Sequence, residues 1–361
     1  PRACLAVRMR IDAHGHKIDH RFTRGLMQSV ASLNYQQVQN AVDGAPDEKT
    51  AGLVEPILKP LYAAYSLLAR AREARQPLDL DLPERRIEIN DEGHVTSVAF
   101  KERLEAHKLI EEFMIFANVA AAETLIQKRT PLLFRVHEEP SPDKLETLRE
   151  VAQAAGLVLA KGQVLQTRHL NALLKQAEGT PQDELINIQT LRAMTQAYYN
   201  PENFGHFGLA LRNYAHFTSP IRRYSDLIVH RGLISAHRWG DDGLSPWDIE
   251  NLEETGQLIS DTERRSMMAE RDTTDRYLAA FLSDRLGAVM EGRISGIARF
   301  GVFIKLDETG ADALIPIRSL GDEFFHFDAE SQSLTGSKSG TVIGLGQRVT
   351  VKLVEAAPVS G

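Results

Sequence analysis

The patterning of the chain changes at Gly287, and this change most limits what the sequence can fold into. Before that residue, apolar side chains recur at helical spacing over long segments, such as 102–128 and 245–286. After it, short alternating stretches are separated by glycine turns, which is typical of a small barrel. The sequence therefore predicts an α+β domain over 1–286, followed by an all-β domain over 287–361.

The first domain is predicted to mix helices with short strands. Pro60 lies where a helix kinks or makes an early turn. The segment 77–83 alternates leucine with aspartate, which favours a half-buried strand. Helices are expected within 25–42 around Tyr35 and over 48–75, 141–155, 167–177 and 182–198, and strands over 4–12, 77–83, 87–89, 95–100 and 131–136.

Composition limits the class of protein. The 361 residues carry a net charge of −7, which argues against a surface that coats nucleic acid generally. A local surplus exists, because Arg212 to Arg231 contains four arginines and one aspartate. The longest apolar run, Phe113 to Ile126, is interrupted by polar residues and is too short to span a bilayer. Cys4 is the only cysteine, so no internal disulfide or thiolate zinc cluster is expected, and we expect a cytoplasmic protein without a membrane partner.

The two ends of the sequence resemble cuts. The chain begins at Pro1 within a strand pattern and stops at Gly361 just after another, 349–354. We therefore expect a fragment of a longer protein, in which the last strand of the barrel is missing.

The stretch from Tyr214 to Asp226 carries the strongest local signal. Ser219 followed by Pro220 predicts a helix start, whose first turn offers unpaired N–H groups to an anion. Two arginines, Arg222 and Arg223, then fall in a first turn, where acidic residues are usual. In one interpretation the two guanidiniums bind a phosphate. In the other they are neutralised by Asp226, one turn later. Local physics leaves these two interpretations equally open.

The same stretch shares its sequence with a known family. The order and approximate spacing of several stretches over the whole chain resemble the RNase R and RNase II (RNB) exoribonucleases, with RNase R the closer branch. These stretches are His206–Leu211, Tyr214–Tyr224, Asp226–Arg231, Leu33–Tyr35, Ala106–Met114 and Met268–Asp272. The resemblance implies the C-terminal part of an RNB catalytic domain, followed by a truncated OB-fold RNA-binding domain of the ribosomal S-one type. It also implies 3′→5′ hydrolysis of single-stranded RNA to nucleoside 5′-monophosphates; association with ribosomes or RNA-decay machinery stays unknown.

The resemblance also assigns roles to single residues. It places Arg222 against the phosphate to be cleaved, as the catalytic residue, with Arg223 among the RNA-binding residues. Tyr35 and Glu112 correspond to residues that hold the 3′-terminal nucleotide and distinguish ribose from deoxyribose, and Glu270 to a wall of the same cleft. A carboxylate can accept a hydrogen bond from a 2′-OH, which DNA lacks.

Plainer explanations exist for these residues. Glu112 is also explained as part of a charged helix face beside Lys108, and Glu270 by pairing with Arg271 or Arg265. Tyr35 is also explained as a half-buried core tyrosine. The histidines His107, His206 and His216 are expected to be structural, because none has the spacing of a metal site.

In the second domain, the predicted strand 302–306 places Phe303 and Lys305 on one face. An aromatic ring beside a cation can stack on a base and hold a phosphate, so Phe300, Phe303 and Lys305 are candidate RNA-binding residues. Barrel core is the alternative for the two phenylalanines. Pro316 stands where the resembled domain often has histidine, which argues against strong binding.

One expected element is absent from the sequence. The resembled family holds Mg²⁺ with aspartates spaced Asp-x5-Asp-x-Asp-Asp, and this spacing does not occur here. In the family that cluster precedes the Tyr35 region, which would fall before Pro1, so we expect no metal ligands in this chain. Leu80 also stands where the family usually has a phenylalanine. The sequence leaves open an inactive part of an exoribonuclease, a non-catalytic RNA-binding remnant and, more weakly, a structural fragment.

Overall fold

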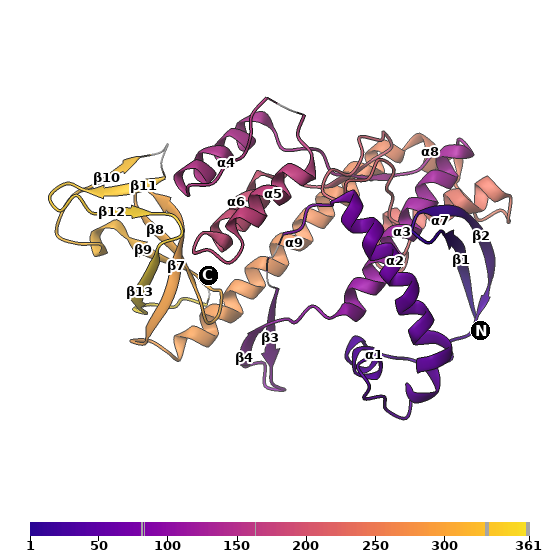
Figure 1. The fold of residues 1–361 in the computed structure, drawn as a ribbon, viewed down its shortest axis with the longest axis horizontal. Helices are drawn as coiled ribbons and strands as arrows, with labels where there is room; N and C mark the ends of the chain where they lie inside the picture. The colour runs from indigo at the N-terminus through magenta and orange to yellow at the C-terminus, as the bar shows by residue number, and fades with distance from the viewer. Residues whose placement is uncertain (81, 83, 163, 329–331, 359–361) are drawn as a thin grey trace.

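The computed structural model describes residues 1–80, 82, 84–162, 164–328 and 332–358. Figure 1 shows an elongated molecule, with the N-terminal hairpin and helices at one end and the C-terminal strands at the other. The long helix α9 (Leu252–Ser283) runs between the two ends. The mixed α+β domain and the C-terminal β region predicted from the sequence are therefore both present.

The chain opens with an antiparallel hairpin of β1 (Arg2–Ile11) and β2 (Lys17–Met27). At the turn, Gly15 has φ +80°, and a Cβ there would lie 2.1 Å from the backbone oxygen of Leu67. The turn therefore requires glycine. The sequence predicted β1 but not β2, because β2 is rich in charged residues and only Phe22 in it is buried.

Three helices follow, and the third of them contributes to the first core. α1 (Tyr35–Val42) begins at a capping box formed by Asn34 and Gln37. Helical turns at Ala51–Leu53 and Val54–Leu58 then lead into α2 (Lys59–Arg75), with Pro60 in its first turn, where a missing N–H is tolerated. The long helix predicted over 102–128 is α3 (Glu105–Gln127). Its alanines pack against the hairpin, β5 (Phe134–Val136) and α7 (Tyr224–His237).

A second core lies between α4 (Pro142–Ala154), α5 (Thr167–Ala177) and α6 (Asp183–Ala193). All three helices were predicted, but α6 ends early. The chain then forms β6 (Tyr198–Asn200), which pairs with β5.

The strand predicted over 77–83 is wrong for residues 77–80 and 82, whereas Asp81 and Pro83 lie outside the described residues. Leu78 and Leu80 instead pack on the second helical core, and the Leu78 N–H donates to the Gly208 carbonyl. These two leucines are partly buried against helices, and among the described residues no strand pairs with this alternating segment.

The remaining elements connect the two ends of the molecule. The predicted strand pair is the hairpin β3 (Arg85–Ile89) and β4 (Val95–Phe100). The predicted helical region after Ser245 is α8 (Pro246–Glu250) followed by α9. No helix in the described parts of the chain is both long and apolar enough to cross a membrane.

The C-terminal strands and the end of α9 share a third core. Among the described residues these strands form two open sheets rather than one closed barrel, with strand orders β13-β7-β8-β9 and β10-β11-β12. The strands are β7 (Val289–Ala298), β8 (Gly301–Leu306), β9 (Asp312–Pro316), β10 (Phe325–Asp328), β11 (Ser333–Gly336), β12 (Val342–Gly344) and β13 (Arg348–Lys352), with a 3₁₀ turn at Ile317–Ser319.

Candidate nucleic-acid site

The loop before α7 differs from its prediction in one important way. Helix α7 begins at Tyr224, not at Ser219, and Arg222 lies in the turn before it. Asp226 is the cause. Its carboxylate has no exposed surface and accepts hydrogen bonds from the Ser219 N–H (2.7 Å) and the Ser225 hydroxyl (3.1 Å). This capture of Ser219 folds the loop back, so the arginines are not in the first helical turn.

The two arginines have different surroundings. Arg223 makes two hydrogen bonds to Asp226, from Nε (2.8 Å) and from a terminal nitrogen (2.9 Å). Arg222 is exposed, and no carboxylate lies within 4 Å of its guanidinium in the described part of the chain. Neutralisation by Asp226 therefore explains Arg223, whereas Arg222 remains available to an anion.

The backbone of the loop is fixed from behind. The buried Asn118 side chain of α3 accepts from the Phe217 N–H (2.9 Å) and donates to the Tyr214 hydroxyl (3.0 Å). His230 of α7 stacks on the Phe217 ring and donates to the Phe217 carbonyl (2.8 Å). Contacts from two helices thus hold the segment that leads to Arg222.

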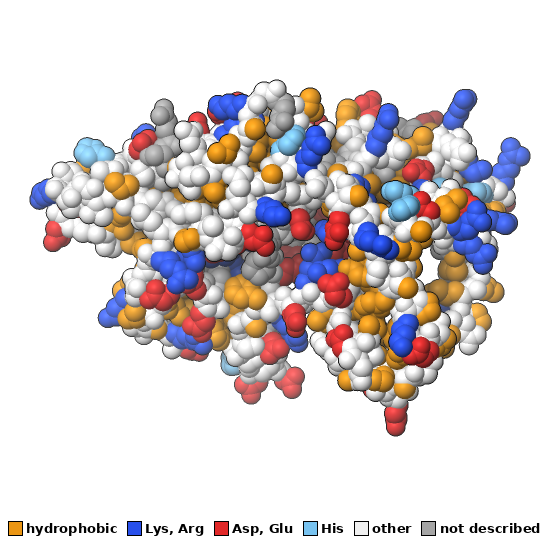
Figure 2. Space-filling view, viewed as in Figure 1, with side chains coloured by type: hydrophobic (Ala, Val, Ile, Leu, Met, Phe, Trp, Pro, Cys, Tyr) orange, Lys and Arg blue, Asp and Glu red, His pale blue; other side chains and the backbone are white. Residues whose placement is uncertain are grey.

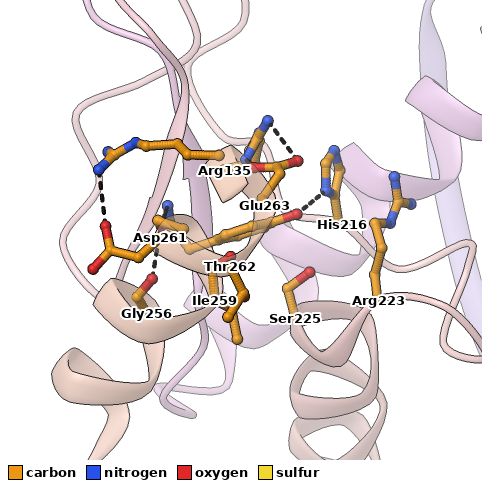
Figure 3. A network of polar contacts seen from close by, with 12 residues as sticks. Arg135, His216, Arg223, Ser225, Gly256, Ile259, Asp261, Thr262 and Glu263 are labelled. Atoms are coloured by element: carbon orange, nitrogen blue, oxygen red, sulfur yellow. Dashed lines mark hydrogen bonds and ion pairs between the residues drawn. The ribbon is translucent and has the colours of Figure 1, made fainter. Parts of the chain in front are cut away.

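A second group of contacts lies behind the same loop (Figure 3). Nδ1 of His216 is 2.9 Å from the Tyr199 hydroxyl, and the Arg135 guanidinium lies 4.7 Å from the centre of the Tyr199 ring. Arg135 also makes a two-point ion pair with Glu263 of α9. In Figure 3, His216 lies between this pair and the Arg223 side chain. The loop is therefore tied to both β5 and α9.

The histidines in this region are neutral. Burial, reinforced by the charges of Arg223 and Arg135, lowers the pKa of His216 to about 2. Burial, with a contribution from His137, lowers the pKa of His206 to about 3. Neutral imidazoles that make hydrogen bonds and edge-to-face ring contacts agree with the structural role predicted for them.

The residues proposed for the 3′-terminal nucleotide lie around α1 and α3. The Tyr35 ring is 44% exposed and stacks on His107, with 4.0 Å between ring centres, so it is not a core tyrosine. Glu112 is buried and pairs with Arg72 of α2 at 3.0 Å, while Lys108 pairs elsewhere, with Glu105. The charged helix face considered for Glu112 is therefore wrong.

The environment of Glu112 has opposing effects on its acidity. Burial raises the pKa of the Glu112 carboxyl, and the nearby positive charges of Arg75 and Arg72 work against that rise. Glu112 and Arg75 also line a cavity of about 410 Å³ between α2 and α3. A partly desolvated carboxylate beside a cavity can accept hydrogen bonds from a ligand.

Glu270 lies elsewhere, on α9. It lines a hollow of about 520 Å³ together with Arg85 of β3 and Tyr277, and no ion pair to Arg265 or Arg271 is formed within the described residues. The cavities of Glu112 and Glu270 are different. The structure brings Tyr35 to the helix of Glu112 but shows no contact of Glu270 with that pair or with Arg222 in the region it describes.

On the C-terminal sheet the predicted faces are confirmed. Val302, Ile304 and Leu306 are buried, while Phe300 and Phe303 are 59% and 38% exposed and meet edge to face. Barrel core is therefore wrong for the two phenylalanines. Lys305 shares their face, but it contacts Glu184 of α6.

Metal-ligand chemistry is not provided by the described residues. Within them no three histidine, cysteine, aspartate or glutamate side chains gather as a metal site would require. Two of the aspartates are paired with arginines, Asp242 with Arg24 and Asp79 with Arg72. A two-metal carboxylate cluster does not fit these residues. Basic and acidic side chains are interspersed on the face shown in Figure 2.

Comparison with known proteins decides the family. A model of the RNB domain matches residues 1–238, and a model of the S1 RNA binding domain matches residues 283–357. The chain belongs to the RNB family. It is 37% identical to ribonuclease R of Escherichia coli K12 over 98% of this chain and 44% of that protein. It is 36% identical to ribonuclease R of Aquifex aeolicus over 97% of this chain and 50% of that protein.

A solved structure agrees with this assignment. Mycoplasma genitalium RNase R, determined as the apo form and with ribose-methylated single-stranded RNA, superimposes with a TM-score of 0.92 at 28% identity. The match covers 99% of this chain and 57% of that one. The RNB chain thus spans half or less of the length of these two curated relatives.

Several residues that shape the site escaped the sequence analysis. Arg135, Tyr199 and Glu263 are far apart in the sequence, and no local pattern signals that they meet. Asn118 had one signal in the sequence, because it is a polar residue inside the longest apolar run of the chain. A buried amide of this kind usually has a structural partner.

Proposed function

We propose that this chain is the RNA-gripping part of a cytoplasmic 3′→5′ exoribonuclease that releases nucleoside 5′-monophosphates from single-stranded RNA. The observation that carries the proposal is the contrast between the two arginines, since Arg223 is bound to Asp226 and Arg222 is exposed without a partner among the described residues. A fixed loop that presents one free guanidinium suits recognition of a phosphate.

In this proposal Arg222 donates hydrogen bonds to the oxygens of the phosphate that is cleaved. The contacts from Asn118, His230 and Asp226 hold the loop in place before RNA arrives, so little reorganisation is needed during the reaction. His216 stays neutral behind the loop and adds no positive charge that would compete for the phosphate.

Tyr35 and Glu112 act on the terminal nucleotide. The exposed Tyr35 ring offers a stacking surface to a base, and Glu112 accepts a hydrogen bond from the ribose 2′-OH. Arg72 contacts Oε1 of Glu112. An ionised carboxylate can accept about four hydrogen bonds, so this ion pair does not exhaust its capacity. Arg223, Glu270, Phe300, Phe303 and Lys305 remain proposed RNA contacts.

The family resemblance implies Mg²⁺, but the described residues do not form its site. We propose that the complete protein depends on Mg²⁺ held by carboxylates outside this chain. The chain by itself then binds single-stranded RNA with strong salt dependence and releases no mononucleotides.

The test is Arg222→Ala in the complete protein. Loss of one preorganised electrostatic group is expected to slow single-turnover cleavage about 10²–10³-fold. RNA affinity should change far less, because other contacts hold the strand. The matched control is Arg276→Ala, which removes an exposed arginine from a different element, helix α9. A normal cleavage rate in the Arg222 variant would exclude this role.

A non-catalytic RNA-binding remnant is the second candidate, and it is favoured by the lack of a carboxylate cluster among the described residues. Labelled single-stranded RNA incubated with Mg²⁺ or Mn²⁺ separates the two. Shortening from the 3′ end by the complete protein supports the enzyme, and intact RNA supports the remnant. Shortening by the 361-residue chain alone would show that it holds a metal site after all.

A further inference from the structure

A row of cations crosses the outer face of the four-stranded sheet. Arg348 of β13 is directly opposite Arg293 of β7, which in turn is directly opposite Lys305 of β8. Residues paired in this way share one face of a sheet, and like charges so placed repel one another. An anion near the row would offset this repulsion.

Glu184, in the first turn of α6, supplies that anion. One of its carboxylate oxygens lies 3.8 Å from Nε of Arg293, and the other lies 3.7 Å from Nζ of Lys305. Both distances exceed hydrogen-bond length, and the Glu184 side chain is 41% exposed. The side chains of Arg293 and Lys305 are 22% and 24% exposed, so these are weak, part-exposed ion pairs, and an anion that approaches from the exposed side of Glu184 can replace the carboxylate.

Other contacts hold α6 against the sheet without Glu184. Arg293 donates to the Pro181 carbonyl (3.0 Å), and Arg192 donates to the Ser295 carbonyl (3.2 Å). Leu345 packs on both the second and the third core, and a Cβ on Gly346 would lie 3.0 Å from Gln182. The approach of α6 to the sheet is visible in Figure 1. Neutralising Glu184 should therefore leave the two parts together.

The neighbouring position on the same face is aromatic. Phe303 lies two residues before Lys305 on β8, with its ring exposed on the outer side. A ring next to a row of cations suits a single strand, which offers both bases to stack and phosphates to bind.

We propose that Arg348, Arg293 and Lys305 form a phosphate-binding row for single-stranded RNA, in which Glu184 occupies the position of one phosphate until RNA displaces it. The choice of RNA as the ligand rests on the proposed function. The row itself rests on the strand register and on the contacts of Glu184.

The first experiment compares Glu184→Gln with the intact 361-residue chain, using a labelled oligouridylate. Removal of the competing carboxylate should tighten binding about threefold at low salt, and the gain should fade as salt rises. Glu178→Gln removes an equal charge from the exposed end of α5 and should change little. An equal gain from Glu178→Gln would overturn the inference.

A second experiment tests whether Glu184 acts through its contact with Lys305. In a chain that already carries Lys305→Gln, the Glu184→Gln substitution should lose part of its effect, because only the contact of Glu184 with Arg293 remains to be released. A full gain in that background would show that Glu184 acts through charge in general.

Tripolyphosphate, which has phosphates but no bases, separates this inference from the proposed function. It should shift the backbone amide resonances of Arg293 and Lys305, and more strongly in Glu184→Gln. If these shifts occur but RNA does not bind, the row stands and the proposed RNA function fails. If tripolyphosphate leaves β7 and β8 unchanged, the inference is wrong whatever the RNA result.

Discussion

The loop 214–226 and the outer face of the C-terminal sheet both present cations, but they hold them in opposite ways. In the loop, Asp226 has no exposed surface and binds Arg223 at 2.8–2.9 Å. On the sheet, Glu184 is partly exposed and lies 3.7–3.8 Å from Lys305 and Arg293. One site is built from short buried hydrogen bonds and the other from long, part-exposed ion pairs.

The difference corresponds to two tasks. A group that stabilises charge during a reaction must be held within about 0.5 Å of its working position, which requires supporting contacts. A surface that grips a moving strand works with stacking and adaptable charge contacts. Under the proposed function, the loop serves the phosphate that is cleaved, and the sheet serves the strand that leads to it.

The largest expected effect comes from the buried carboxylate of the loop. Asp226→Asn leaves the Arg223 guanidinium without its counter-charge and should lower the free energy of unfolding by about 3–5 kcal/mol. Denaturant unfolding measures this. Asp261→Asn, which breaks the exposed pair with Arg264, is the control and should cost less than about 1 kcal/mol. Equal effects would remove the contrast between buried and solvated pairs.

The neutral histidines predict a pH dependence of stability. The pKa values of His206 and His216 are about 3 and about 2 in the folded protein, below the ordinary value of 6.5. Below pH 6.5 the unfolded chain binds protons that the folded chain does not, so stability falls as pH falls. Between pH 6.5 and 5.5 the two residues together should cost about 2 kcal/mol.

Urea unfolding at both pH values checks this effect. His216→Asn should reduce the pH dependence of the free energy of unfolding. The same slope in His216→Asn and the intact chain would mean that His216 does not contribute.

On the sheet, Phe303→Ala should weaken binding of single-stranded RNA by about 1 kcal/mol or more, since one stacked base is lost. Stability should change little because the ring is already part-exposed. Phe324→Ala removes another exposed phenylalanine, beside β10, and should leave RNA binding unchanged. A fluorescence titration compares the two. Equal losses would argue against a specific stacking position.

The smallest effect is expected in sugar choice. Tyr35→Ala combined with Glu112→Gln should narrow the preference for RNA over matched DNA about three- to tenfold, the value of one hydrogen bond. Glu111→Gln, at the exposed neighbouring position, is the control. Binding of both oligonucleotides is measured for each variant. An unchanged preference for RNA over DNA would mean that Tyr35 and Glu112 have a structural role only.

Local pattern determined much of the fold. The helical spacing before Gly287 predicted α3, α4 and α5 within a few residues, and the alternation in 302–306 predicted which side chains β8 buries. The pattern succeeded there because periodicity is set by the backbone of the element itself. It failed for 77–80, where burial came from helices packed on an irregular segment.

The sequence by itself placed Arg222 and Arg223 beside an acidic residue and left two interpretations open. Only the tertiary structure decided between the two interpretations. Asp226 accepts hydrogen bonds from Arg223 and from the Ser219 N–H, and α7 begins at Tyr224. Glu112 pairs with Arg72 of α2 rather than with Lys108 on its own helix. Glu184 lies near two cations that are more than a hundred residues away in the sequence. A charged side chain selects its partner by distance in space and by burial, and neither quantity is written in local spacing.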